Sequence, residues 1–307
     1  MTIQCDADVV RDKFLSCHGN VIKSLKNFDL EVIEQTEKWI RDEGGGGETC
    51  SFSNGKCLDK GGINFSDVHG NNLPPSALKD RPELTGSVFR AMGVSVVFHP
   101  INPNVPTAHA NIRFFTTTDR DGNAVWWFGG GFDLTPYYPI LEDVIFWHEE
   151  AKKLCDRFDI NLYPKFKEQC DKYFYLPHRK ETRGVGGIFF DNFTLTDFET
   201  SLEFCEGVMS VFASSFFKIF EKRKMMPYTM DDQAFQSYRR GRYVEFNLVY
   251  DRGTHFGLQS GGRTESILMS MPPVAKWEYN WKPKPGSKEE NLYKNFLKPQ
   301  DWLNLHK

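Results

Sequence analysis

The stretch GVSVVFHPINPNVPTAHANIRFF, residues 93–115, contains two segments of alternating residue character, separated by a turn rich in Pro and Asn. Successive side chains of a strand point to opposite faces of a sheet, so this alternation predicts two neighbouring strands. One face of the pair is apolar, which makes it the expected core face, and it carries Val94, Val96, Phe98, Ala110, Ile112 and Phe114. The other face carries Ser95, Val97, His99, His109, Asn111 and Arg113.

The flanking sequence extends this sheet. The segment AVWWFGGGF (124–132) predicts a third strand, and the tight turn RDGN (120–123) before it favours a hairpin. Apolar or alternating runs predict further strands at 186–192, 241–250 and 266–273. Strands thus come partly as adjacent pairs and partly between helices, which indicates one mixed or antiparallel sheet covered by helices.

Helical periodicity is found in four longer segments. They are residues 6–43 with a break near Gly19-Asn20, 139–158, 161–175 and 197–223. The polar tail from Lys282 is expected to end in a short helix, and Gly44–Gly47 to be a linker or a mobile loop close to a ligand. Neither an internal repeat nor a sharp boundary divides the chain, so we expect a single domain over residues 1–307.

Composition excludes several classes of protein. The 307 residues carry a formal net charge of −3 without a long basic run, so a general nucleic-acid surface is not indicated. No apolar stretch approaches the roughly 20 residues that span a bilayer. The N-terminus is acidic and lacks the apolar block of a signal peptide, which predicts a cytoplasmic protein. The 7 cysteines form no C-x-x-C pair and are expected to be reduced structural thiols.

The polar face of the two central strands is the strongest candidate for a site. His109, Asn111 and Arg113 share it with Ser95 and His99, and all five are hydrogen-bonding types. Lys and Glu, the usual solvating residues, are missing from this face. A merely solvated sheet face is the alternative, but the residue types favour a surface that binds an anionic ligand.

Three further arginines stand close to glycines. They are Arg179 and Arg183, before the Gly-Val-Gly-Gly run at 184–187, and Arg263 after Gly261-Gly262. Arginine binds carboxylate or phosphate through two parallel hydrogen bonds, and glycine lets the backbone approach a ligand closely. Together with Arg113, these residues suit a substrate with several negative groups. Surface ion pairs are the alternative for Arg179 and Arg183.

Asp133 and four histidines complete the candidates. Asp133 follows the glycine run 129–131, where a bulky ligand could reach its carboxylate, although a turn or helix-capping Asp is the alternative. The four histidines are weak metal-ligand candidates whose spacing matches no compact metal motif, and His148 lies on an apolar helix stripe that favours a core histidine. These histidines are His99, His109, His148 and His178.

Several long segments, in order along the chain, resemble oxygen-dependent coproporphyrinogen III oxidases. They are SVVFHPINPNVPTAHANIRFF, WWFGGGFDLTPYY, HRKETRGVGGIFFDN and GLQSGGRTESILMSMPP, together with GGINFSDVHG (61–70) and the tail segment 299–303. The resemblance covers nearly the whole chain from Gly44 onward. It is weaker at 48–57, Ser260 stands where the family commonly has Thr, and Phe132 stands where a small residue or Cys is usual.

The resemblance implies an α+β fold, a single large antiparallel sheet flanked by helices on both faces, in a homodimer. It implies conversion of coproporphyrinogen III to protoporphyrinogen IX in haem biosynthesis, in which the ring A and B propionates become vinyl groups. Dioxygen is the implied co-substrate, CO2 and hydrogen peroxide are the by-products, and no cofactor is required. A divalent metal, which some descriptions of the family assign to the four histidines, is the weaker alternative.

The family's site positions fall on residues already singled out. The resemblance implies His109, Asp133 and Arg113 as catalytic residues, with His109 as the acid and Asp133 accepting hydrogen bonds from pyrrole N–H groups. The implied substrate-binding residues are Ser95, Asn111, Arg113, Arg179, Arg183, Gly261, Gly262 and Arg263. Two other classes stay open: a metal-dependent hydrolase or decarboxylase built on the histidines, and a tetrapyrrole carrier without catalysis.

Overall fold

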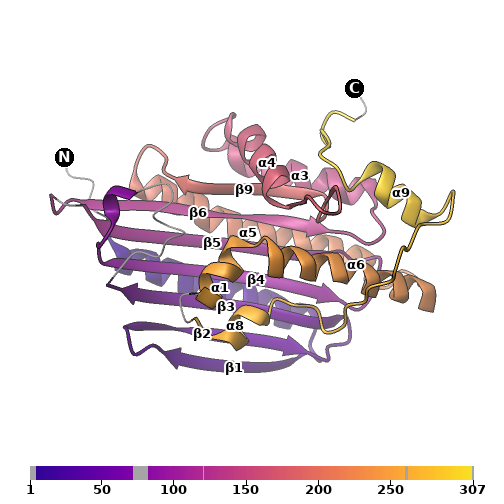
Figure 1. Ribbon diagram of the computed structural model, residues 1–307, viewed down its shortest axis with the longest axis horizontal. Coiled ribbons are helices and arrows are strands. Elements are labelled where there is room, and N and C mark those ends of the chain that lie inside the picture. The colour runs from indigo at the N-terminus through magenta and orange to yellow at the C-terminus, as the bar shows by residue number, and fades with distance from the viewer. Residues whose placement is uncertain (1–4, 72–81, 120, 260–261, 306–307) are drawn as a thin grey trace.

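The computed structural model describes residues 5–71, 82–119, 121–259 and 262–305. Seven antiparallel strands form one sheet in the order β1-β2-β3-β4-β5-β6-β9, so only β9 joins out of sequence order, through two helices (Figure 1). A second, two-stranded ribbon consists of β7 and β8. The strands are β1 Ile33–Ile40, β2 Gly45–Ser53, β3 Leu58–Gly70, β4 Phe89–Pro100, β5 Thr107–Thr118, β6 Ala124–Thr135, β7 Tyr175–Leu176, β8 Glu181–Thr182 and β9 Gly186–Phe193.

Helices cover both faces of the sheet, as Figure 1 shows. The apolar face packs against α1 and α5, where Phe98 of β4 stacks on Phe216 of α5 with 5.2 Å between ring centroids. No helix in the described part of the chain is long and apolar enough to cross a bilayer. The helices are α1 Ala7–Phe28, α3 Leu141–Asp156, α4 Leu162–Tyr173, α5 Phe198–Arg223, α6 Met230–Val249, α7 Arg252–Gln259, α8 Thr264–Leu268 and α9 Lys288–Asn295, with a 3-10 turn at Pro82–Leu84.

The polar face lies beneath α6, α7 and α8 (Figure 1). α8 is tied to this face through Ser266, whose hydroxyl lies 2.7 Å from that of Thr49 and whose carbonyl accepts a 2.7 Å hydrogen bond from Asn64. α6 is tied to the end of β4 by Arg240, which donates to the Pro100 carbonyl at 3.0 Å. Side chains rather than close backbone packing therefore bridge the space between the sheet and α6.

The sequence predictions for the central sheet are confirmed. β4 and β5 include both alternating segments, and β5 and β6 form the expected hairpin around Asp119–Asn123, although Arg120 lies outside the described residues. The predicted strand 186–192 is β9, and the helices 139–158, 161–175 and 197–223 are α3, α4 and α5. The antiparallel sheet with helices on both faces confirms the expected fold class.

The prediction for residues 6–43 is wrong after Phe28. α1 runs without a break through Gly19-Asn20, and the chain then enters the edge strand β1, most of whose side chains are exposed. An edge strand needs no apolar face, so its pattern is hard to distinguish from a polar helix. Gly44–Gly47 is neither linker nor mobile loop: Gly44 closes the β1–β2 turn with φ +109°, and Gly47 pairs with Trp39.

The predicted strands 241–250 and 266–273 are also wrong. Residues 241–249 continue α6, which begins at a capping box formed by Thr229 and Asp232. Along this helix Arg239, Tyr243 and Asn247 recur every four residues and are buried on one side, a helical period that the local alternation hid. In the second segment, α8 ends at Leu268 and is followed by turns.

Candidate active site

Strand β5 places the central candidates on the polar face at three successive levels. His109 pairs with Val97 and Asp133, Asn111 with Ser95 and Gly131, and Arg113 with Gly93 and Gly129. The side chains on β5 and Ser95 are partly exposed, whereas their apolar neighbours Ala110 and Ile112 are buried. The period-2 prediction therefore holds: the sheet gathers His109, Asn111, Arg113, Ser95 and Asp133 on one face.

His109 and Asp133 form the first part of a hydrogen-bonded chain. The Nδ1 atom of His109 lies 2.9 Å from Oδ1 of Asp133, so an Nδ1–H donor leaves Nε2 as the nitrogen free for chemistry. Arg183 binds the same carboxylate through Nη2 to Oδ1 at 2.7 Å and Nε to Oδ2 at 3.2 Å. Its third nitrogen, Nη1, donates to Oδ1 of Asn247 at 2.9 Å. This chain fixes the orientation of the imidazole ring.

Arg183 is enclosed by aromatic rings. Its guanidinium carbon lies 4.3 Å from the ring centroid of Phe174, 4.5 Å from that of Tyr243 and 4.7 Å from that of Phe246. Asp133 is 1% and Arg183 2% exposed. Burial raises the pKa of Asp133, but Arg183 and His109 lower it by more, so the carboxyl has a pKa below its ordinary value and is ionised.

This burial argues against the direct substrate contacts that were expected from the sequence for Asp133 and Arg183. The two carboxylate oxygens already accept three hydrogen bonds from His109 and Arg183, and the side chain is buried, so a pyrrole N–H has little access to the remaining lone pair. Every guanidinium nitrogen of Arg183 donates to Asp133 or Asn247, and no face of it is open to a substrate carboxylate. In this arrangement both residues lie on the buried side of the site and fix the orientation of His109.

Arg113 is the arginine that borders His109 and Asn111 on the open face, and its side chain is 39% exposed. Its Nη2 lies 3.0 Å from the Asp191 carboxylate and its Nη1 donates to Asn111 at 3.2 Å. A side chain at Gly129 would meet the Arg113 guanidinium at 2.6 Å, so this glycine leaves the space in which the arginine lies. Gly129 therefore makes room for Arg113, and the glycine run lies within the paired strand β6 rather than in a loop beside Asp133.

Asp191 links Arg113 to a second arginine. Arg252, the first residue of α7, lies 3.1 Å from the other Asp191 oxygen and stacks over the Tyr173 ring at 5.0 Å. Burial raises the pKa of Asp191, and the two arginines lower it by more, leaving it below its ordinary value. The carboxylate thus holds two guanidinium groups side by side at the edge of the polar face.

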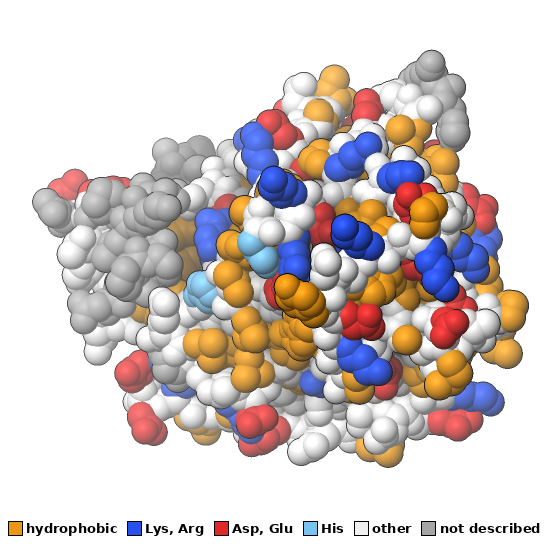
Figure 2. Space-filling view, turned by 45° about the vertical axis from the view of Figure 1, so that its right-hand side comes forward, with side chains coloured by type: hydrophobic (Ala, Val, Ile, Leu, Met, Phe, Trp, Pro, Cys, Tyr) orange, Lys and Arg blue, Asp and Glu red, His pale blue; other side chains and the backbone are white. Residues whose placement is uncertain are grey.

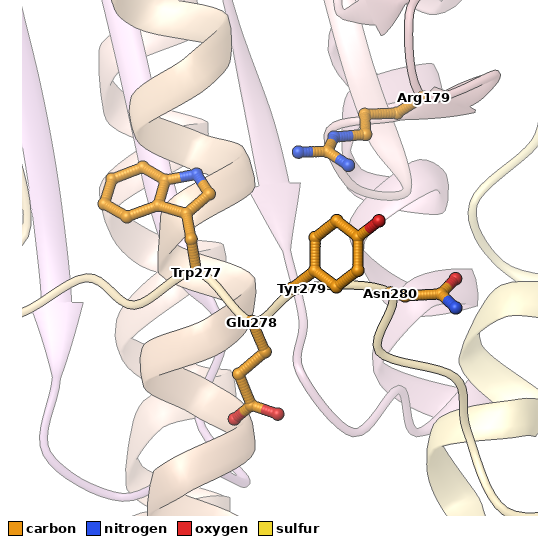
Figure 3. A pocket seen from close by; sticks show the side chains of 5 residues that line it. All are labelled: Arg179, Trp277, Glu278, Tyr279 and Asn280. Carbon is orange, nitrogen blue, oxygen red and sulfur yellow. The ribbon is translucent and has the colours of Figure 1, made fainter.

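Arg179 lies in a separate surface groove. The groove has a volume of about 620 Å³ and is lined by Arg179, Trp277, Glu278, Tyr279 and Asn280 (Figure 3). Arg179 makes a two-pronged ion pair with Glu245, through Nη2 at 2.7 Å and Nε at 2.9 Å. On the face that Figure 2 shows, basic and acidic side chains are intermixed with hydrophobic groups. Arg179 therefore forms the surface ion pair that was the alternative reading.

The Arg263 candidate lies at the far end of a polar row. Glu37, Thr49, Asn64, Ser95 and Asn111 are cross-strand neighbours from β1 to β5. Arg263 pairs with Glu37 at the β1 end. Gly262 donates from its backbone to the Gly257 carbonyl at 2.8 Å, and Gly261 lies outside the described residues. One atom in this row, the buried Oδ1 of Asn64, has no hydrogen-bond partner within the described residues.

The four metal-candidate histidines have separate surroundings. His99 is hydrogen-bonded to Thr107 and the Ser270 carbonyl, and His148 to Tyr163 and the Val185 carbonyl. His178 contacts Tyr250 and Glu245 on the surface. Burial lowers the pKa of His148 to about 3, as expected of a neutral core histidine. Within the described ranges no three-ligand cluster includes any of the four, so they do not fit a shared metal here.

Three residues of the site were not predicted from the sequence. Asn247 positions Arg183, and Asp191 and Arg252 position or accompany Arg113. Asn247 lies in the segment misread as a strand, where the four-residue spacing from Tyr243 was an available signal. Asp191 lies within the apolar strand β9, and its pairing depends on contacts 78 and 61 positions away that no local pattern contains.

A comparison with protein families supplies independent evidence. The family model described as coproporphyrinogen III oxidase matches residues 9–302. The match includes every site residue discussed above and every strand of the large sheet.

Proposed function

The chain belongs to the coproporphyrinogen III oxidase family, and from this membership we propose that it is the oxygen-dependent enzyme, which converts coproporphyrinogen III to protoporphyrinogen IX. The family is one of oxidoreductases of haem biosynthesis. The observation that carries the oxygen-dependent proposal is the set of groups around His109. An oriented imidazole, a partly exposed arginine and Asn111 share one face, and none of the described residues forms a cysteine cluster that would suit an iron–sulfur centre.

The proposed reaction balances for each propionate with one dioxygen. R–CH2–CH2–COO⁻, O2 and one proton give R–CH=CH2, CO2 and H2O2. The β-carbon loses a hydrogen, the C–C bond to the carboxylate breaks, and its electron pair forms the vinyl bond. The two electrons lost by the propionate reduce dioxygen to peroxide. Rings A and B react in this way, so each substrate molecule consumes two dioxygen molecules and two protons.

Arg113 is proposed to hold the reacting carboxylate. A guanidinium has five N–H donors in a planar fork. Asp191 and Asn111 occupy Nη2 and Nη1, and the partly exposed side chain retains donors for a carboxylate. Dioxygen reduced beside this cation gains the same electrostatic stabilisation as the carboxylate.

His109 is proposed to deliver the proton that the balance requires. Its Nδ1 atom faces Asp133, so Nε2 is directed away from the carboxylate. Imidazole is the side chain that most often serves as a general acid or base in proton transfer. We propose that Asp133 and Arg183 act by orienting His109, instead of the direct pyrrole contact that the family resemblance implies for Asp133.

The polar row is proposed to bind the rest of the macrocycle. Ser95 on β4 lies within the row, Asn111 and Arg113 lie at its β5 end, and Arg263 pairs with Glu37 at its β1 end. Four strand spacings separate β1 from β5, about 19 Å at ~4.8 Å each. A wide substrate with carboxylates at its rim suits such a spacing of arginines. Arg179, engaged with Glu245, is proposed to contribute only at the periphery.

An assay with and without oxygen tests the proposal. The purified protein is incubated with coproporphyrinogen III in air and under argon, and the porphyrins are separated after oxidation. The proposal requires vinyl porphyrin and hydrogen peroxide in air and neither under argon. Product under argon excludes oxygen as the oxidant, and bound substrate without product in either gas indicates a carrier.

The same assay after exhaustive chelation tests the requirement for a metal. We propose that no metal is needed, because the four histidines are bonded to separate protein groups. Undiminished turnover by chelated protein is expected. Turnover that disappears and returns with an added divalent ion contradicts it.

We also propose that the protein is a cytoplasmic homodimer. Within the described chain, β1 has a neighbour on one side only, and Ile33 and Ile40 on it are exposed. An unprotected edge strand with exposed apolar residues is a suitable pairing surface. Light scattering on the purified protein tests the dimer, and cell fractionation tests the location.

A further inference from the structure

A second group of potential ligands lies on the opposite face of the sheet from the candidate active site. His18 projects from the middle of α1, and Glu48 and Cys50 occupy alternate positions of β2. The Cys50 partner on β3 is Ile63, a residue of the apolar core. We propose that His18, Glu48 and Cys50 bind one divalent transition-metal ion, with Zn²⁺ as the class of ion that suits the three donors.

The spacing of the three donors fits a common ion. One ligand atom from each residue lies within 4.8 Å of the other two, a cluster found nowhere else in the described residues. Cys50 Sγ lies 3.9 Å from His18 Nε2 and 3.8 Å from Glu48 Oε1, and His18 Nδ1 lies 3.9 Å from Glu48 Oε1. Zinc bonds of 2.0–2.3 Å in a tetrahedron place ligand atoms about 3.3–3.8 Å apart. Because His18 Nε2 faces the Ile63 carbonyl and Nδ1 faces Glu48, an ion bound to Nδ1 requires the Cys50 sulfur to move toward that nitrogen, a rearrangement of up to roughly 1 Å within the 4.8 Å cluster.

The same distances leave the groups weakly bonded to one another. A nitrogen–oxygen separation of 3.9 Å between His18 and Glu48 is too long for a hydrogen bond. Lys38, at 3.4 Å from the other Glu48 oxygen, is an exposed partner that can swing away. The half-buried carboxylate thus faces an imidazole without bonding to it, as two ligands of one ion would before it binds.

The surroundings of His18 favour a metal ligand. The ring is 3% exposed, and its Nε2 lies 3.3 Å from the Ile63 carbonyl. A ring that donates one N–H to a backbone carbonyl presents the lone pair of its other nitrogen, the usual arrangement of metal-bound histidine. Burial also lowers the pKa of His18, which keeps the ring neutral.

Cys50 and Glu48 supply the negative charge. Cys50 is 1% exposed, and burial raises the pKa of its thiol, so without metal the sulfur keeps its proton. Metal binding would expel this proton, which makes the affinity rise with pH. The Glu48 side chain is 24% exposed and marks the side from which an ion and a fourth, water ligand would enter.

Cobalt titration of the whole protein tests this inference, because Co²⁺ replaces Zn²⁺ in such sites and reports thiolate ligation by a near-ultraviolet charge-transfer band. Wild-type protein should bind one equivalent with this band, and Zn²⁺ should displace it. Cys50→Ser should abolish the band, and His18→Ala should weaken binding by at least about 10-fold. Cys57→Ser, at a partly exposed cysteine outside the cluster, is the matched control and should behave as wild type.

Glu48→Gln provides a second test in case Cys50→Ser or His18→Ala, at buried positions, fails to fold. The Glu48 side chain is partly exposed and the substitution keeps its size. Zn²⁺ should raise the unfolding midpoint of wild type and Cys57→Ser but not of Glu48→Gln. Three results overturn the proposal: no thiolate band in wild type at saturating Co²⁺, a band that survives Cys50→Ser, or equal stabilisation of Glu48→Gln by Zn²⁺.

Discussion

Replacing Asp133 by Asn tests whether the buried ion pair with Arg183 stabilises the fold and orients His109. The substitution keeps the shape of the side chain but removes its charge and turns an amide N–H₂ toward a guanidinium donor. Arg183 is 2% exposed and would stay charged without a partner in a low-dielectric environment. Breaking a buried pair in this way costs about 3–5 kcal/mol, a large part of the stability of a typical domain. Proton delivery by a misoriented His109 should also slow turnover by about 10²–10⁴-fold.

A double-mutant cycle measures this cost. Urea denaturation is followed for wild type, Asp133→Asn, Arg183→Met and the double variant. Methionine can fill the space between the rings of Phe174, Tyr243 and Phe246, so the double variant should regain most of the stability but none of the activity. Glu168→Gln, at an exposed helix pair, is the control and should unfold as wild type does. The reasoning is refuted if Asp133→Asn loses less than about 1 kcal/mol or if the two changes are additive.

Three further changes test the other parts of the site. Arg113→Lys should lower kcat/KM by at least about 10-fold in the coupled oxygen assay, because an ammonium cannot form the fork that binds a carboxylate, and unchanged kinetics contradict that contact. Gly129→Ala should also lower kcat/KM, with the sheet retained by circular dichroism, because its methyl group would meet the Arg113 guanidinium at 2.6 Å; equal activity contradicts the need for this space. Burial raises the pKa of Glu245, but the hydrogen bonds from Arg179 and His178 lower it by more, so the pKa is about 2, below the ordinary value of ~4.3. The ionised carboxyl therefore stabilises the fold at a pH above its unfolded pKa, and this stabilisation is lost as the pH falls toward 2. Glu245→Gln should flatten the dependence of the urea unfolding free energy on pH between about 5 and 3, and an unchanged slope contradicts the prediction.

The central part of the fold was predictable because strong local patterns and tertiary burial agree there. The alternation predicted for residues 93–115 appears as alternating burial over residues 93–96 of β4 and 108–114 of β5, whereas Val97 and His99 on the polar face are buried. The segment 241–250 alternates just as clearly, yet it forms part of α6 because Tyr243 and Asn247 are buried against partners on distant strands and loops. Local periodicity could not reveal that competition.

The candidate site was predicted in part, for a related reason. His109, Asn111 and Arg113 share a strand, so their common face follows from period 2. Whether an arginine is free or engaged depends on its partner, and the partners of Arg183 and Arg179 lie 50 and 66 positions away. The sequence therefore indicated the arginines as candidates but could not separate exposed arginines from those already paired within the protein.

The arginines differ in which groups engage them and in whether they lie on the face of His109. Arg183 has each of its three nitrogens bonded and its faces covered by rings, and Arg179 is held by both of its prongs on Glu245. Arg113 is partly exposed, retains N–H donors beyond those given to Asp191 and Asn111, and lies on the same face as His109. A substrate carboxylate that competes for a guanidinium gains most where a charge is already desolvated on one side and still unsatisfied on the other. Among these three arginines only Arg113 combines remaining donors with a place on the face of His109, which is why we propose that it holds the reacting propionate while the buried pair of Asp133 and Arg183 orients His109.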